Sequence, residues 1–284
     1  MSEKLKLYYA RIGNMGDLLN PLIIGGLFGF DVERSSFLTG EMTAIGSGLD
    51  QYVYHGTAPM RARQFANGLL RPSVQVWGTG FINYPSGGER FFKRDMRFCA
   101  VRGELSRRRA EALAGKELCI PTGDAGILAS LLIREPIEKQ YDLGIVPHVC
   151  DLSDPGVGRL LESYSGGSTV LINVKDEPLE VLRAIARCRT VLSSSLHGLI
   201  AADSFGIPNR HVVFSDRPKG DGFKFDDYYS AYGVPHIVSD LRVSAAPSLA
   251  DIAEAYPIGS DMVLGKKRAM LAAFPYPIPN AVTI

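Results

Sequence analysis

The segment 190–208, TVLSSSLHGLIAADSFGIP, carries the strongest candidate for chemistry in this chain. It predicts a strand, a serine-rich turn and a helix that begins near His197 and stops at Gly-Ile-Pro. The serines, among them Ser194 and Ser195, can cap this helix beside Leu196, and Gly198 allows close approach. Free N–H groups and the helix dipole favour an anion. His197 can bind that anion or move a proton, unless it merely satisfies a turn carbonyl.

A second candidate follows the first predicted strand, in the segment 11–20, RIGNMGDLLN. Asn14, Gly16 and Asn20 line a glycine turn that enters a helix, and the glycines let the backbone approach a ligand. Asp17 either caps this helix or accepts a proton from a sugar hydroxyl. The segment is not G-x-G-x-x-G and no P-loop lysine follows, which argues against dinucleotide or nucleoside triphosphate binding.

Further candidates stand at other strand ends. Arg102, in CAVRGELS, leaves a strand just before a helix, where it can grip a carboxylate or phosphate or pair with a nearby acid. Gly78 and Thr79 of WGTGF and Asp124 of PTGDAGIL, an expected N-cap, are weaker candidates with a structural alternative. His148 ends the predicted strand DLGIVPH, facing the presumed cleft.

A long glycine-rich loop is expected over 215–229, SDRPKGDGFKFDDYY, and such loops are commonly functional. Lys224 is the preferred second cation for the anion, and Arg217 is another candidate; a solvated run of charges is the alternative. The basic, aromatic stretch 90–97, RFFKRDMR, is expected to be a surface helix or turn, with at most peripheral contact with an anionic membrane.

Short β-rich runs followed by Gly or Ser turns and helices position these residues, which predicts an α/β fold with parallel strands. The polar segment 134–141 separates an apolar helix over 125–133 from a fresh strand. We expect an N-terminal domain over 1–138, a C-terminal domain over 139–260 and, over 261–284, a tail whose helix (262–274) packs back on the first domain. The predicted strands are 5–9, 74–77, 98–101, 142–146, 169–174, 190–192 and 211–214.

Composition excludes several classes of protein. The chain has 284 residues, 46% hydrophobic residues and a formal net charge of +1, which argues against nucleic acid as a partner. Four separated cysteines suggest neither disulfides nor a zinc site. The N-terminus lacks a signal-peptide core and no apolar run could span a bilayer, so we expect a protein of the cytoplasm, including the inner face of the cell membrane.

Together these segments resemble the polysaccharide pyruvyl transferase family. NMGDLLN, WGTG, VRGELS, PTGDAGIL, GIVPH, SSLHGLIAADSFGIPN and KFDDYY occur in that family's order, from about residue 11 to 229. The resemblance implies two Rossmann-like domains facing a cleft, as in GT-B glycosyltransferases. It also implies phosphoenolpyruvate as co-substrate without a metal or redox cofactor, and as acceptor a sugar of an exopolysaccharide or of its lipid-linked precursor.

Given this donor, we expect phosphoenolpyruvate to bind at the start of the His197 helix, where Arg102 and Lys224 neutralise its charges, and we assign the general acid and base to His197 and Asp17. Many family members have an arginine where this chain has Ser195, so Arg217 or Lys224 would compensate. Two alternatives remain open. One is a GT-B-type glycosyltransferase that uses a nucleotide sugar, and the other is a non-catalytic module that binds a sugar or an anion.

Overall fold

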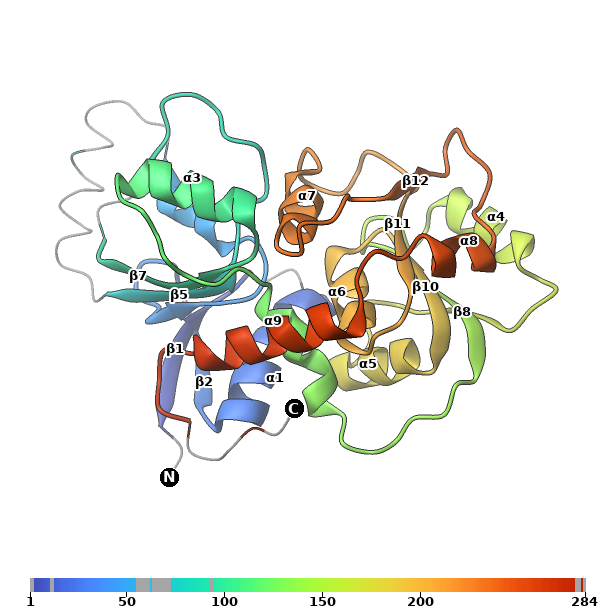
Figure 1. The fold of residues 1–284 in the computed structure, drawn as a ribbon, viewed down its shortest axis with the longest axis horizontal. Helices are drawn as coiled ribbons and strands as arrows, with labels where there is room; N and C mark the ends of the chain where they lie inside the picture. Colours follow the sequence, from blue (N-terminus) through green and yellow to red (C-terminus); the bar gives the residue numbers. More distant parts are fainter. Residues whose placement is uncertain are drawn as a thin grey trace.

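This computed structural model contains two five-stranded parallel β-sheets with helices packed around them (Figure 1). The structure describes residues 3–10, 13–54, 62, 73–91, 94–278 and 282. The expected α/β class with parallel sheets is therefore confirmed. The candidate residues all lie within the described part, whereas positions 11 and 12 of the glycine-turn segment lie outside it.

The first sheet has the order β2-β1-β3-β5-β7, with all neighbouring strands parallel. A separate antiparallel pair, β4 and β6, flanks it. The strands are β1 (Lys4–Tyr8), β2 (Asp31–Ser35), β3 (Met42–Thr43), β4 (Val53–Tyr54), β5 (Val74–Thr79), β6 (Arg90–Phe91) and β7 (Met96–Val101). The helices among and after them are α1 (Met15–Phe28), α3 (Glu104–Ala114) and the 3₁₀ helices η1 (Gly48–Tyr52) and η2 (Ala125–Leu132).

The second sheet has the order β12-β11-β10-β8-β9, again parallel throughout. Its strands are β8 (Tyr141–Val146), β9 (Thr169–Leu171), β10 (Cys188–Ser193), β11 (Asn209–Val213) and β12 (Val238–Asp240). Its helices are α4 (Pro155–Ser163), α5 (Pro178–Ala186), α6 (Leu196–Ser204), α7 (Phe223–Ser230), α8 (Leu249–Glu254) and α9 (Ser260–Ala272).

Both sheets share one connectivity. Numbered by their order along the chain, the strands of each sheet lie 2-1-3-4-5, so the direction of winding reverses between the first and third strands. In open parallel sheets, ligands bind beyond the carboxyl ends of the strands at this reversal. The two positions to inspect are therefore the ends of β1 and β3 and the ends of β8 and β10.

The last helix ties the two sheets together and is drawn in red in Figure 1. The indole N–H of Trp77 in β5 donates to the carbonyl of Met270 at 3.0 Å, and Phe274 stacks on Phe28 of α1 with ring centroids 3.7 Å apart. Lys267 donates to the hydroxyl of Ser130 and to the carbonyl of Ser204 at the end of α6. Helix α9 therefore contacts β5 and η2 of the first half of the chain and α6 of the second half.

Several expected elements differ from those observed. Residues 223–230 form helix α7 rather than loop; Phe223, Phe225, Tyr228 and Tyr229 are buried on different sides of it, so the helix is packed into the protein interior. The apolar helix expected over 125–133 is the 3₁₀ helix η2, and the strand expected over 169–174 ends at Leu171. The ends of the stretch 90–97 lie in β6 and β7 rather than in a helix or turn; its residues 92–93 lie outside the described residues. Strands β2, β3 and β12 were not predicted.

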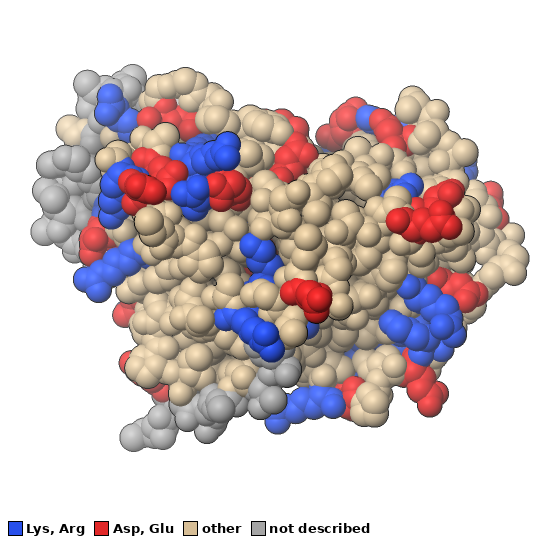
Figure 2. Space-filling view, in the orientation of Figure 1, with Lys and Arg blue, Asp and Glu red and all other residues tan. Residues whose placement is uncertain are grey.

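The visible surface carries intermixed charge. Figure 2 shows Lys and Arg side chains beside Asp and Glu side chains over much of this face, without a continuous field of one sign. Some of the charged side chains of the protein form ion pairs, such as those of Arg107 with Glu104 and with Glu111. In the described part of the chain, no helix is both long and apolar enough to cross a membrane.

Candidate active site

The strand ends at the two reversals of winding meet around His197. Gly16 stands in the first turn of α1, after β1, and Gly46 follows β3. His197 lies in the first turn of α6, after β10. A Cβ atom on Gly16 would lie 2.2 Å from Nδ1 of His197, and one on Gly46 would lie 3.9 Å from its Cε1. The imidazole of the second sheet thus packs on glycines of the first.

His197 is held as a neutral imidazole. Burial, and then the positive charges of Arg102 and Lys224, lower the pKa of His197 to about 3, with a smaller contribution from interaction with His148. Its Nε2 atom is covered and has no hydrogen-bond partner in the described residues. A neutral imidazole with an unsatisfied nitrogen can accept a proton or bind a polar group of a ligand. The alternative, a structural histidine that donates a hydrogen bond to a turn carbonyl, is not observed at Nε2.

The serines before α6 do not cap it through their side chains. Ser195 occupies the N-cap position without a side-chain capping bond, and Leu196 behind it is buried. Ser193 instead accepts the N–H of Ser195 at 3.0 Å. A Cβ on Gly198 would lie 2.4 Å from Oγ of Ser193, so this glycine allows the helix to approach the strand ends.

Ser194 fixes the loop after β8 rather than α6. Its hydroxyl accepts the N–H of His148 and donates to Asp151, both at 2.8 Å. Burial, followed by the charge of Lys224, lowers the pKa of His148 to about 4. His148 is therefore a second neutral imidazole in the same electrostatic neighbourhood as His197.

Arg102 is fully buried and bound by the protein itself. Its Nε donates to Asp227 of α7 at 2.8 Å, Nη1 donates to the Ser47 hydroxyl at 3.1 Å and to the Gly46 carbonyl at 3.3 Å, and Nη2 donates to the Phe81 carbonyl. The pairing with a nearby acid, one of the two roles expected for Arg102, is thus present. The arginine still contributes to the low pKa of His197.

Lys224 uses one hydrogen bond from its ammonium group within the described residues. Its Nζ donates to the backbone carbonyl of Lys219 at 3.2 Å, and it forms no ion pair with the described residues. Burial and then the charge of Arg102 lowers the pKa of Lys224 to about 8. Arg217, in contrast, pairs with Asp154 and is half exposed. Lys224 is therefore better suited than Arg217 to bind an added anion.

Asp124 is a buried acid at the start of η2. Its Oδ1 accepts the N–H of Gly126 at 2.8 Å, so the expected N-cap is confirmed. Its Oδ2 has no hydrogen-bond partner in the described residues. Burial raises the pKa of Asp124 to about 7, although Arg102 and backbone N–H groups lower it.

The other predicted residues shape the loops around this centre. Asn14, not Asp17, caps α1 by accepting a hydrogen bond from the N–H of Asp17. Burial, and to a smaller extent the carboxylate of Asp17, raises the pKa of Tyr8. Asn20 bonds both backbone groups of Ile45. Thr79 donates to the carbonyl of Gly46 at 3.0 Å. These contacts hold the loop after β3 against α1 and β5.

Gly78 allows the close approach of β5 to η2. It has a φ of 79°, and a Cβ on it would lie 2.6 Å from the backbone nitrogen of Ala125. The residue next to Asp124 is therefore pressed against the end of β5.

Sequence reasoning missed three residues of this centre. Asp227 pairs with Arg102 and also accepts the N–H and hydroxyl of Ser106. Asp151 accepts hydrogen bonds from the hydroxyls of Ser194 and Ser215, and Gly46 lies where an added Cβ would be 3.9 Å from Cε1 of His197. Asp227 lies in the quoted motif KFDDYY, but nothing in the sequence indicated that Arg102 was its partner.

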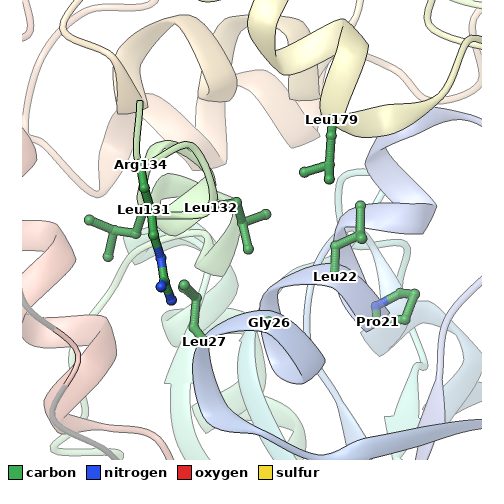
Figure 3. A pocket seen from close by; sticks show the side chains of 8 residues that line it. All are labelled: Pro21, Leu22, Gly26, Leu27, Leu131, Leu132, Arg134 and Leu179. Carbon is green, nitrogen blue, oxygen red and sulfur yellow. The ribbon is translucent and has the colours of Figure 1, made fainter. Parts of the chain in front are cut away.

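Two pockets lie away from His197. One of about 340 Å³ lies between α1, η2 and the start of α5, where leucines line it with Arg134 as the charged lining residue (Figure 3). The other, of about 410 Å³, is lined by residues of α3 and α9, including Glu104 and Lys266, and by the two residues that follow α7. Among the described residues, no three His, Cys, Asp or Glu side chains gather as metal ligands would.

Comparisons with known proteins identify the family. The family model for polysaccharide pyruvyl transferase matches residues 42–216, more than half of the chain, a range that includes Arg102, Asp124 and His197. The chain is also 31% identical over 166 residues to uncharacterized protein L143 of Acanthamoeba polyphaga mimivirus. That match covers 56% of this chain and 55% of the viral protein, so the chain spans about half the length of this curated relative. The chain belongs to the polysaccharide pyruvyl transferase family.

Proposed function

We propose that this protein transfers pyruvate from phosphoenolpyruvate to two hydroxyls of one sugar, forming a cyclic ketal and releasing phosphate. The acceptor is a sugar of a bacterial exopolysaccharide or of its lipid-linked precursor, met in the cytoplasm or at the inner face of the membrane. Family membership supports transfer to a polysaccharide. The observation that carries the proposal of an anionic donor is the unsatisfied Nε2 of His197, close to two cations.

Lys224 is the direct ligand of the donor in this proposal. Its ammonium group donates one hydrogen bond, to the Lys219 carbonyl, lies 5.2 Å from the centre of the Phe225 ring and forms no ion pair with the described residues, so an anion can pair with it. Arg102 adds a second positive charge, although its own donors largely bind protein groups. Lys224 also compensates for the arginine that many family members carry where this chain has Ser195.

The reaction needs one proton at the methylene carbon of phosphoenolpyruvate and a base for each attacking hydroxyl. Protonation makes the neighbouring carbon electrophilic, one hydroxyl attacks it, phosphate leaves and the second hydroxyl closes the ring. His197, neutral at pH 7, acts as base for the first hydroxyl. Asp17, the acid or base expected from sequence, lies beside Gly16, the glycine on which His197 packs.

Domain movement gives substrates access in this proposal. We assign the two sheets to two domains, 1–138 and 139–260, that open and close as in GT-B glycosyltransferases. Nε2 of His197 is covered by protein in the described arrangement, so the donor reaches it only if the flanking elements separate. Closure then excludes water and assembles the site from both sheets.

The direct test is the melting temperature with and without millimolar phosphoenolpyruvate, since a ligand specific to the native state raises it. We expect a rise in the wild type that is lost in Lys224→Met and reduced in His197→Asn. UDP and GDP serve as competitors in the same assay. A rise with a nucleoside diphosphate and none with phosphoenolpyruvate would replace this proposal with glycosyl transfer from a nucleotide sugar.

Turnover is measured as phosphate released from phosphoenolpyruvate with methyl glucoside, methyl galactoside and methyl mannoside as acceptor probes. His197→Asn should lower the release by about 10²–10⁴-fold. Binding of phosphoenolpyruvate and of the glycosides without any phosphate release would identify a non-catalytic binding module instead.

A further inference from the structure

Four buried side-chain atoms of the described residues have no hydrogen-bond partner, and two of them lie around Gly126. These two are Oδ2 of Asp124 and Nε2 of His197, whose side chains, through Oδ1 and Cδ2, border Gly126; the others belong to Tyr52 and Asn209. Buried polar atoms without partners are rare, and at functional sites they mark groups that a substrate satisfies. No contact within the fold explains why Oδ2 of Asp124 and Nε2 of His197 are buried, so we ask whether a substrate satisfies them.

The two side chains are neighbours. A Cβ on Gly126 would lie 3.0 Å from Oδ1 of Asp124 and 3.8 Å from Cδ2 of His197. Gly46 borders both as well: its N–H lowers the pKa of Asp124 although it is outside hydrogen-bond geometry to Oδ2, and a Cβ on it would lie 3.9 Å from Cε1 of His197. An acid and a base thus flank the same two glycines, which leave room between larger side chains.

The capping role of Asp124 uses only one of its oxygens. Oδ1 accepts the N–H of Gly126, which satisfies the start of η2. An asparagine would accept the same bond through its own carbonyl oxygen. Replacing Asp124 with asparagine therefore keeps the capping hydrogen bond and removes the carboxyl proton.

The surroundings favour the protonated acid. Asp124 is completely buried, and this burial raises its pKa to about 7 against the lowering effect of Arg102. Asp227 raises the pKa further, and the phenol of Tyr232 and the imidazole of His197 also face this region. Asp17, by contrast, is only partly buried. A carboxyl that stays protonated near neutral pH is suited to donate a proton.

We propose that Asp124 is the proton donor of the transfer, giving its carboxyl proton to the methylene carbon of phosphoenolpyruvate, an assignment that rests on the proposed function. The O–H bond of Asp124 breaks as the C–H bond forms, and the sugar oxygen bonds to the adjacent carbon while His197 takes its proton. The carbon–oxygen bond to phosphate then breaks, and phosphate leaves with the proton from His197. The second hydroxyl forms the second bond and returns its proton to Asp124.

The decisive variant is Asp124→Asn, with Asp203→Asn as the matched control. Asp203 is also completely buried with a pKa raised to about 6 by burial, but Tyr228, Tyr256 and Asn209 satisfy its oxygens. Phosphate release with the three methyl glycosides should fall by about 10²–10⁴-fold in Asp124→Asn and by less than about tenfold in Asp203→Asn. The rise in melting temperature with phosphoenolpyruvate should persist in both.

Infrared spectroscopy tests the same acid without any acceptor. The wild type and Asp203→Asn should show a protonated carboxylic acid band that titrates near pH 7 and shifts when phosphoenolpyruvate binds, and Asp124→Asn should lack this band. Binding of phosphoenolpyruvate that leaves the band unmoved, or undiminished phosphate release by Asp124→Asn, would overturn the assignment. An unchanged melting temperature of the wild type with phosphoenolpyruvate would instead remove the proposed function itself.

Discussion

The Nε atom of Arg102 lies 2.8 Å from Oδ2 of Asp227, and neither side chain is exposed to solvent. Arg102 follows β7 of the first sheet and Asp227 lies in α7, after β11 of the second. This buried ion pair therefore joins the two halves of the chain directly behind the candidate site. Ser106 donates to the same carboxylate and fixes its orientation.

Asp227→Asn should destabilise the protein by about 3–5 kcal/mol, because it leaves the guanidinium of Arg102 buried without its counter-charge. Denaturant unfolding measures the change. Asp240→Asn, which breaks the solvent-exposed pair with Arg242, is the control and should lose far less. Equal losses in the two variants would show that the buried pair contributes nothing special.

Gly16→Ala should displace His197, because the added Cβ would lie 2.2 Å from Nδ1 of the imidazole. We expect a loss of about 1–3 kcal/mol in stability, as for other overpacked sites, and a fall in transfer of up to about 10²-fold. Gly158→Ala on α4 is the control, since a Cβ there meets nothing within 4 Å. Wild-type turnover in Gly16→Ala would show that the position of His197 is not critical.

Binding of phosphoenolpyruvate should weaken as the pH rises through about 8. Burial lowers the pKa of Lys224 to about 8, so the ligand-free protein loses this positive charge above that pH, whereas a bound anion favours the charged form. The expected slope is at most about tenfold in Kd per pH unit above pH 8. Titration calorimetry at pH 7, 8 and 9 measures it.

The control for that slope is Lys219→Met, which alters an exposed lysine of the loop before α7 and should keep the pH dependence. Lys224→Met should bind weakly with no break near pH 8. A wild-type affinity that stays constant from pH 7 to 9 would exclude Lys224 as the titrating ligand.

Phe274→Ala should loosen helix α9 from the first sheet. The ring stacks on Phe28 and meets Trp77 edge to face at 5.0 Å, so its removal should cost about 3–5 kcal/mol in stability. Met262→Ala, at an exposed position of the same helix, should change stability by less than about 0.5 kcal/mol. Thermal and denaturant unfolding of both variants decide whether α9 holds the fold together or only lies upon it.

Local pattern was enough to predict much of the site. The strand and helix around His197, the cap at Asp124 and the α/β class depend on residues within a few positions of one another, so turn chemistry and hydrophobic runs reveal them. Short strands escaped detection: β3 has two residues and β12 three, too few for a period to register. The helix α7 was hidden by glycines and charges at its start.

The sequence by itself determined which candidate side chains occur in the loops and helix starts after the strands: His197, His148, Arg102, Asp124 and Lys224. Only the tertiary structure decided what each of them meets. It pairs Arg102 with Asp227, 125 positions away, and packs Gly16 on His197. It also removes water from Asp124 and His197, shifting their pKa values in opposite directions. Burial and charge pairing depend on distances between segments remote in the chain, and no local pattern encodes those distances.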